Sequence, residues 1–134
     1  MPTEAGATPP QDAADRALAD LVTEIDRCVD ELRQARARAE TLSRYRRDGE
    51  AWVDVVTSEA RPLIVERIST VLATLSAAGH RWRREQAAAL QAEQISINRI
   101  AALFGVTRQR ISALLRETDQ TEQADGTDRA DPAG

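Results

Sequence analysis

The sequence has no lysine, a single cysteine and very few aromatic residues. All 18 basic residues of this 134-residue chain are arginines, so any cationic contact to a phosphate or a base is made by a guanidinium, which can bind through two parallel hydrogen bonds. Because Cys28 is the only cysteine, no disulfide can form within the chain. The chain also has only one histidine, so no Cys/His metal site is expected. Aromatic residues form only 3% of the chain, which favours packed helices over a sheet sandwich.

Long apolar runs are also missing. No stretch of about 18 apolar residues occurs, and the N-terminus has neither a basic start nor an apolar core, so we expect no membrane span, no secretory signal and a cytoplasmic location. The sequence holds no Ser/His/Asp set and no glycine-rich phosphate loop. We therefore expect a protein that is not an enzyme and that needs no cofactor or metal.

The net charge of −4 is distributed unevenly along the chain. Residues 1–15 contain three acids and no arginine, while residues 117–134 contain six acids and one arginine. Residues 81–116 contain seven arginines and two glutamates, which gives this segment a local charge of +5. Because a partner responds to the local field, this segment is suited to a polyanion although the whole chain is acidic.

The segment from Asp12 to Arg47 has the periodicity of one long amphipathic helix. Its apolar residues recur in steps of 3 and 4 over more than three heptads, which is typical of a coiled-coil seam. A lone helix cannot bury such a seam, so its partner is either a second copy or the next helix of the same chain. We expect a homodimer formed through this seam. The seam consists of Leu18, Leu21, Ile25, Cys28, Leu32, Ala35, Ala39 and Leu42.

Two further helical segments are expected before residue 94. Asp48-Gly49 ends the first helix, and a second region, Glu50 to Ala78, should break near Arg61 because Pro62 removes a donor and clashes with the preceding turn. Gly79 indicates a helix stop, after which a third helix runs over 81–93. The expected organisation is a disordered N-terminus over 1–11, a helical oligomerisation region over 12–79, a domain over 80–118 and a disordered acidic tail over 119–134.

The strongest pattern lies between Ser96 and Glu117. Ser96 and Thr107 are good N-caps for two successive helices. Gly105 lies between these helices, where it permits the left-handed conformation that ends a helix and turns the chain. Ala101 is small enough for the two helices to cross closely. The residues expected to form this motif and its small core are Ile100, Ala101, Phe104, Gly105, Val106, Ile111 and Leu114.

This pattern resembles the helix-turn-helix family of DNA-binding domains. It is most similar to the trihelical forms found in resolvase-type recombinases and in the promoter-reading region of sigma factors. The resemblance covers Ser96 to Glu117 and does not extend to the first 80 residues. It implies a trihelical domain, so we expect an all-α fold in which the coiled-coil arm precedes this domain, as in small bacterial regulators. In that family the second helix enters the major groove of duplex DNA.

The resemblance also implies which side chains meet DNA. Arg108 would read guanine, Gln109 adenine and Ala113 the methyl group of thymine. Phosphate contacts, which position the protein without specifying sequence, would come from Arg99, Arg110, Ser112 and Arg116. The groove-facing residues are Thr107, Arg108, Gln109, Ser112, Ala113 and Arg116.

We therefore expect a dimeric, nucleoid-associated regulator of transcription that binds specific DNA sequences. Two alternatives remain open. One is a nucleoid, segregation or recombination-accessory protein that binds many DNA sites. The other is a helical adaptor that binds a protein and no DNA.

Overall fold

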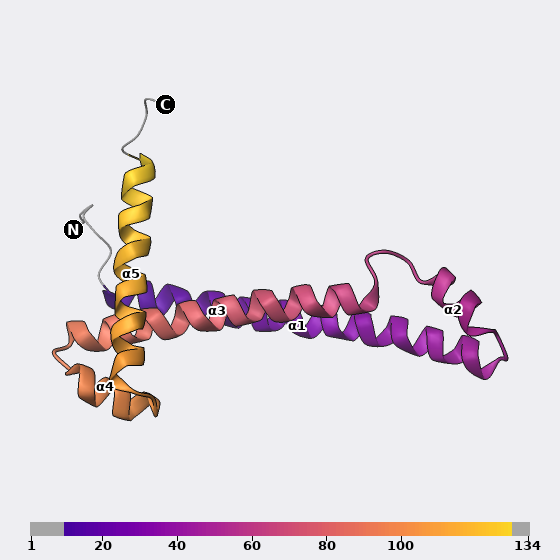
Figure 1. Ribbon diagram of the computed structural model, residues 1–134, viewed down its shortest axis with the longest axis horizontal. Coiled ribbons are helices and arrows are strands. Elements are labelled where there is room, and N and C mark those ends of the chain that lie inside the picture. Colours follow the sequence, from indigo (N-terminus) through magenta and orange to yellow (C-terminus); the bar gives the residue numbers. More distant parts are fainter. Residues whose placement is uncertain (1–9, 130–134) are drawn as a thin grey trace. The chain divides into compact units, whose positions relative to one another are not determined.

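The structure is a computed structural model that describes residues 10–129 of the chain. Five helices account for most of the described residues, which contain no strand, so the predicted all-α fold class is confirmed (Figure 1). The helices are α1 (Pro10–Arg47), α2 (Trp52–Ser58), α3 (Ile64–Ala92), α4 (Ile97–Phe104) and α5 (Arg108–Arg129).

The chain divides into two compact units. The first, which we call the hairpin, holds residues 20–78 and therefore most of α1, all of α2 and the beginning of α3. The second, which we call the C-terminal unit, holds residues 79–129 together with the first residues of α1, 10–19. Each unit is described by itself below.

Within the hairpin, α1 and α3 run antiparallel and side by side (Figure 1). The thiol of Cys28 is buried and donates to the carbonyl oxygen of Val71 over 3.8 Å, a weak contact that places this cysteine in the helix interface as a small apolar residue. Arg67 Nη2 bonds to Glu31 Oε2 over 2.9 Å and to Gln34 Oε1 over 3.1 Å. These contacts, made by residues far apart in the sequence, define the register of the two helices.

The predicted seam of α1 divides between two faces of the helix. Alternate members are buried or half-buried within the chain, as expected for an intramolecular interface: Leu21, Cys28, Ala35 and Leu42. The other members are exposed: Leu18, Ile25, Leu32 and Ala39. The heptad spacing therefore describes two adjacent stripes, and only one of them is covered within this chain.

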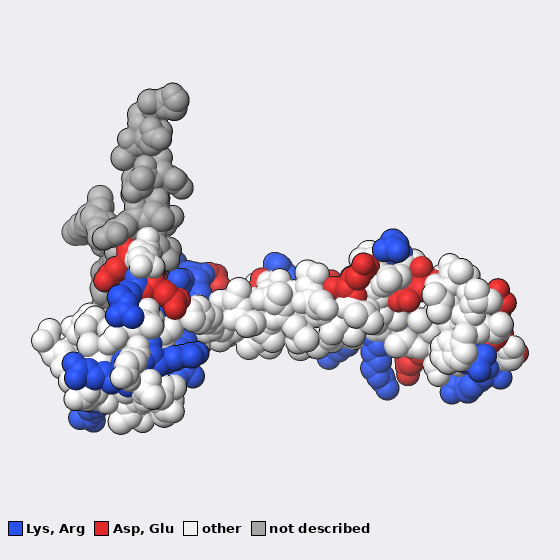
Figure 2. Space-filling model, viewed as in Figure 1, with Lys and Arg blue, Asp and Glu red and all other residues white. Residues whose placement is uncertain are grey.

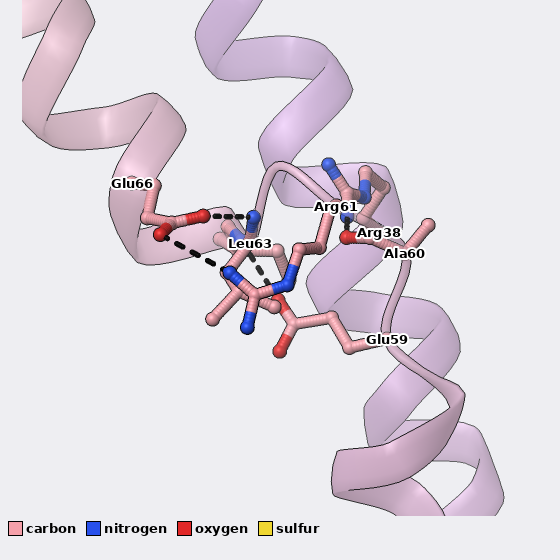
Figure 3. Close-up of polar contacts among 7 residues, drawn as sticks. Arg38, Glu59, Ala60, Arg61, Leu63 and Glu66 are labelled. Carbon is pink, nitrogen blue, oxygen red and sulfur yellow. Dashed lines mark hydrogen bonds and ion pairs between the residues drawn. The ribbon is translucent and has the colours of Figure 1, made fainter.

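The connection between α2 and α3 lies where Pro62 was expected to interrupt the helix, and that prediction is confirmed. Two glutamates cap the start of α3: Glu66 Oε1 accepts from the backbone N–H of Leu63 over 2.8 Å, and Glu59 Oε2 accepts from that of Ile64 over 2.7 Å (Figure 3). These carboxylates satisfy amides that have no partner within the helix. The guanidinium of Arg38 on α1 also bonds to the carbonyl oxygen of Ala60 (Figure 3).

The short helix α2 covers only part of the hairpin end. Val55 is its one buried residue, whereas Trp52 is 63% exposed and lies beneath the guanidinium of Arg46, whose Cζ is 4.6 Å from the ring centroid. Trp52 therefore contributes a cation–π contact at the surface rather than an anchor in the core.

Gly79 does not end a helix, so this prediction is wrong. Helix α3 continues through it to Ala92, because a single glycine costs a helix about 1 kcal/mol and the flanking alanines, leucines and arginines are good helix formers. The helix ends where Gln94 adopts a positive φ of 71°, and the backbone N–H of Ile95 then bonds to the carbonyl oxygen of Leu90 over 3.1 Å.

The helices extend further toward both ends of the chain than predicted. Helix α1 begins at Pro10, since proline is well tolerated at a first helical position, and residues 1–9 lie outside the described residues. Helix α5 continues to Arg129 instead of ending near residue 118. An established helix extends without a new nucleation step, and Gln120, Glu122, Gln123 and Ala124 are residues that propagate it. Residues 130–134 lie outside the described residues.

Candidate nucleic-acid interface

Helix α4 is closed at both ends by local hydrogen bonds. At its start, Ser96 Oγ accepts from the backbone N–H of Arg99 over 3.1 Å, as predicted for an N-cap. At its end, Gly105 adopts the left-handed conformation with φ 71° and ψ 33°, and its N–H bonds to the carbonyl oxygens of Ala101 and Ala102. The predicted role of Gly105 at the turn is therefore confirmed.

The turn into α5 is held mainly by its backbone. The N–H of Val106 bonds to the carbonyl oxygen of Ala101 over 3.0 Å, and Thr107 Oγ1 caps α5 by accepting from the N–H of Arg110 over 3.2 Å. The side chain of Val106 is 36% exposed and does not join the core. Its predicted core position is therefore wrong, because the backbone bond fixes the turn and leaves the isopropyl group at the surface.

One small apolar core joins three helical segments of the C-terminal unit. Ile100 and Ala101 reach it from α4, Ile111 and Leu114 from α5, and Ala87 from α3; Ile100, Ile111 and Ala87 are completely buried. Partly buried residues surround this cluster. These are Leu90, Ile95, Ile97, Phe104 and Leu115. The predicted core residues other than Val106 are thus brought together, with Phe104 at the edge.

The first turns of α5 present a polar face away from this core. Four side chains of that face line one open surface hollow: Arg108, Gln109, Ser112 and Arg116. Their spacing of 1, 3 and 4 residues places them on one side of the helix. Sequence reasoning named all four, and the structure brings them together around a shared surface.

The remaining predicted contact residues do not line this hollow. Thr107 is exposed and is engaged as the cap of α5, while Ala113 is half-buried. Arg110 is exposed and close enough to Glu117 to influence that carboxyl group. Arg99 is exposed on the first turn of α4. These two arginines offer exposed guanidinium groups on separate helices.

Sequence reasoning missed a polar contact between α3 and α5. No pattern in the sequence singles out His80, but its Nε2 lies 2.6 Å from Glu117 Oε1. The hydrogen bond with His80 lowers the pKa of Glu117 below its ordinary value; the charges of His80, Arg84 and Arg110 act in the same direction, and partial burial opposes them. The two residues are 37 positions apart, so no local pattern could have indicated the pair.

Arginine side chains gather over the part of the C-terminal unit where α4 and the beginning of α5 lie (Figure 2). One of the arginines in this unit, Arg83 on α3, stacks on Phe104 with its Cζ 4.5 Å from the ring centroid. The contact covers the exposed edge of the core with a guanidinium, which adds positive charge beside the turn without opening the apolar cluster.

Other kinds of site are not evident in the described part of the chain. Among its residues, no group of three or more His, Cys, Asp or Glu side chains could hold a metal ion, and no helix combines the length and apolarity that crossing a bilayer requires. Comparison of the chain with protein-family models, with curated proteins and with solved structures finds no match. The function must therefore be argued from the residues themselves.

Proposed function

We propose that this protein binds specific sequences of duplex DNA by inserting the first turns of α5 into the major groove. The observation that carries the proposal is the exposed face of α5, where Arg108, Gln109, Ser112 and Arg116 line one hollow. A helix fits the major groove, where each base pair presents a distinct pattern of donors and acceptors. Hydrogen-bonding side chains on one helix face are suited to reading that pattern.

Each side chain has a role that follows from its chemistry. The guanidinium of Arg108 donates two parallel hydrogen bonds to O6 and N7 of guanine, and the amide of Gln109 both donates to and accepts from adenine. Ala113 offers a methyl group to thymine. Ser112 and Arg116 lie further along α5, where they bind phosphates together with Arg99 and Arg110.

The support behind this face favours recognition rather than flexible contact. Both Ser96 and Thr107 cap their helices, and the core below includes the fully buried Ile100 and Ile111. A reading helix that is held by such packing loses little conformational freedom on binding, so more of the contact energy contributes to discrimination among bases.

The charge of the segment supports a polyanionic partner. Residues 81–116 carry a net +5 although the chain carries −4. Phosphate contacts of this kind give affinity that falls as salt rises, because bound cations are released from DNA. Control of transcription is the role that we propose for such a DNA-binding protein, and it implies association with the nucleoid.

The test is binding of the full chain to a duplex chosen by selection from a random pool, followed by the same measurement on Arg108→Ala. We expect this variant to lose about 1–3 kcal/mol of discrimination at one base pair. Arg61→Ala is the matched control, because Arg61 is an exposed arginine of the hairpin, paired with Glu66 at 3.6 Å, and its loss should leave base preference unchanged.

Two outcomes would redirect the proposal. Binding to every duplex with equal affinity and a steep salt dependence would favour a nucleoid protein without sequence preference. No binding to any duplex at low salt would contradict a DNA-binding role and leave the protein adaptor as the remaining candidate.

A further inference from the structure

The hairpin leaves one apolar stripe of α1 uncovered. Val22, Ile25, Val29 and Leu32 recur in steps of 3, 4 and 3, and they are 52%, 44%, 40% and 43% exposed. This stripe lies one position beyond the interface with α3, since Val29 directly follows the buried Cys28. Its spacing is that of the a and d positions of a coiled coil, with valine at one and leucine or isoleucine at the other.

Helix α3 extends this apolar face. Val65 and Leu72, seven residues apart, are 72% and 55% exposed, and Leu72 directly follows the buried Val71. In an antiparallel helix pair, the position after an interface residue lies on the same side of the pair for both helices. The exposed valines and leucines of α1 and α3 therefore form one continuous surface, larger than scattered apolar residues on an ordinary exterior.

The charges of α1 indicate what covers this surface. Residues 20–31 contain five acids and one arginine, a net −4, whereas residues 32–47 contain six arginines and one glutamate, a net +5. A second copy of the same helix, turned end for end, places each acidic half against a basic half. A copy in the parallel sense would place like charges together.

We infer that two copies of this chain associate through this face, with α1 packed antiparallel against α1 of the second copy. The stripe is self-complementary in that sense, because Val29 then faces Leu32 of the second copy and Val22 faces Ala39 of the second copy, while acidic residues 20–29 lie against residues 32–41. Each valine of the stripe then meets a leucine or an alanine across a two-fold axis between residues 30 and 31, as an isologous dimer requires.

The consequence for DNA rests on the proposed function. A dimer carries two copies of the α5 face, so a palindromic site would be bound through two half-sites, with an apparent affinity above that of one unit. The pairing itself needs no DNA and involves no residue of the candidate interface.

The first experiment is sedimentation equilibrium of the full chain without DNA. We expect a dimer, and we expect Ile25→Asn combined with Leu32→Asn to raise the dissociation constant at least about 100-fold, since the change removes apolar contacts twice in a two-fold dimer. Both positions are exposed, so helix content by circular dichroism should be retained. The matched control is Val53→Asn with Val56→Asn, which alters two similarly exposed valines on α2 and should leave the dimer intact.

The second experiment tests the orientation by disulfide trapping in a Cys28→Ala background. When a chain with Val22→Cys is mixed with a chain carrying Ala39→Cys, the antiparallel arrangement predicts a mixed disulfide dimer. A parallel arrangement would instead trap each variant with its own copy. Three results would each overturn the inference. These are disulfide trapping of like copies only, a parent chain that is monomeric, and a stripe variant that dimerises as tightly as the parent.

Failure of this inference is distinguishable from failure of the proposed function. A monomer that still enriches a DNA sequence would overturn the pairing alone. A trapped antiparallel dimer that binds no duplex would overturn the DNA-binding proposal alone.

Discussion

Replacing Gly105 by alanine should destabilise the chain through backbone conformation alone. Gly105 has a φ of +71°, and a Cβ built on it would meet no atom within 4 Å. No steric clash therefore enters the expected change. The left-handed conformation costs an L-residue with a side chain about 1–2 kcal/mol, so the free energy of unfolding should fall by roughly that amount.

The same substitution at Gly79 is the matched control and should act in the opposite sense. Gly79 lies inside α3, and a Cβ there also meets nothing within 4 Å. Alanine in a helix interior is favoured over glycine by about 0.5–1 kcal/mol, partly because the unfolded chain has less freedom to lose. Gly79→Ala should therefore raise the free energy of unfolding.

Urea unfolding followed by circular dichroism measures both changes, with the slope of the transition checked for constancy. The expected result is a lower midpoint for Gly105→Ala and a higher midpoint for Gly79→Ala. If both variants shifted in the same direction, either the left-handed turn at Gly105 or the continuity of α3 through Gly79 would be refuted.

Two further predictions concern the core and the polar contact of the C-terminal unit. Ile111→Ala should lower the free energy of unfolding by about 2–5 kcal/mol, because Ile111 is fully buried. Val106→Ala, at the exposed turn, should lower it far less. Equal losses in the two variants would contradict the division between core and surface. Because the pKa of Glu117 is lowered in the folded chain, its carboxylate stabilises the fold at pH values above the ordinary glutamate pKa of about 4.3. This contribution is lost as the pH falls through the lower pKa of the folded state. His80→Ala should therefore reduce stability at neutral pH, and its difference from the parent chain should shrink as the pH falls below the ordinary glutamate pKa. Urea midpoints that differ by the same amount throughout this range would contradict the contact.

Local chemistry made much of the C-terminal unit predictable. The caps at Ser96 and Thr107 and the turn at Gly105 depend on residues within four positions of one another, so the sequence contains their causes directly. The break at Pro62 is local in the same sense. The expected face of Arg108 and Gln109 follows from helical periodicity once those boundaries are known.

Features that depend on distant neighbours were not predictable in this way. The heptad steps of α1 are shared by two adjacent stripes, and only the position of α3 determines that Cys28 is covered while Ile25 is exposed. Val106 is apolar, but its backbone bond rather than its side chain holds the turn. The contact between His80 and Glu117 requires α3 to continue through Gly79, which a local helix-stop signal argues against.

The central claim is that the face lined by Arg108, Gln109, Ser112 and Arg116 reads DNA sequence. The most direct measurement is selection of bound duplexes from a random pool with the purified full chain. We expect enrichment of a defined sequence, arranged as two inverted half-sites if the chain pairs as inferred. A pool that shows no enrichment after repeated rounds would contradict sequence-specific recognition by α5.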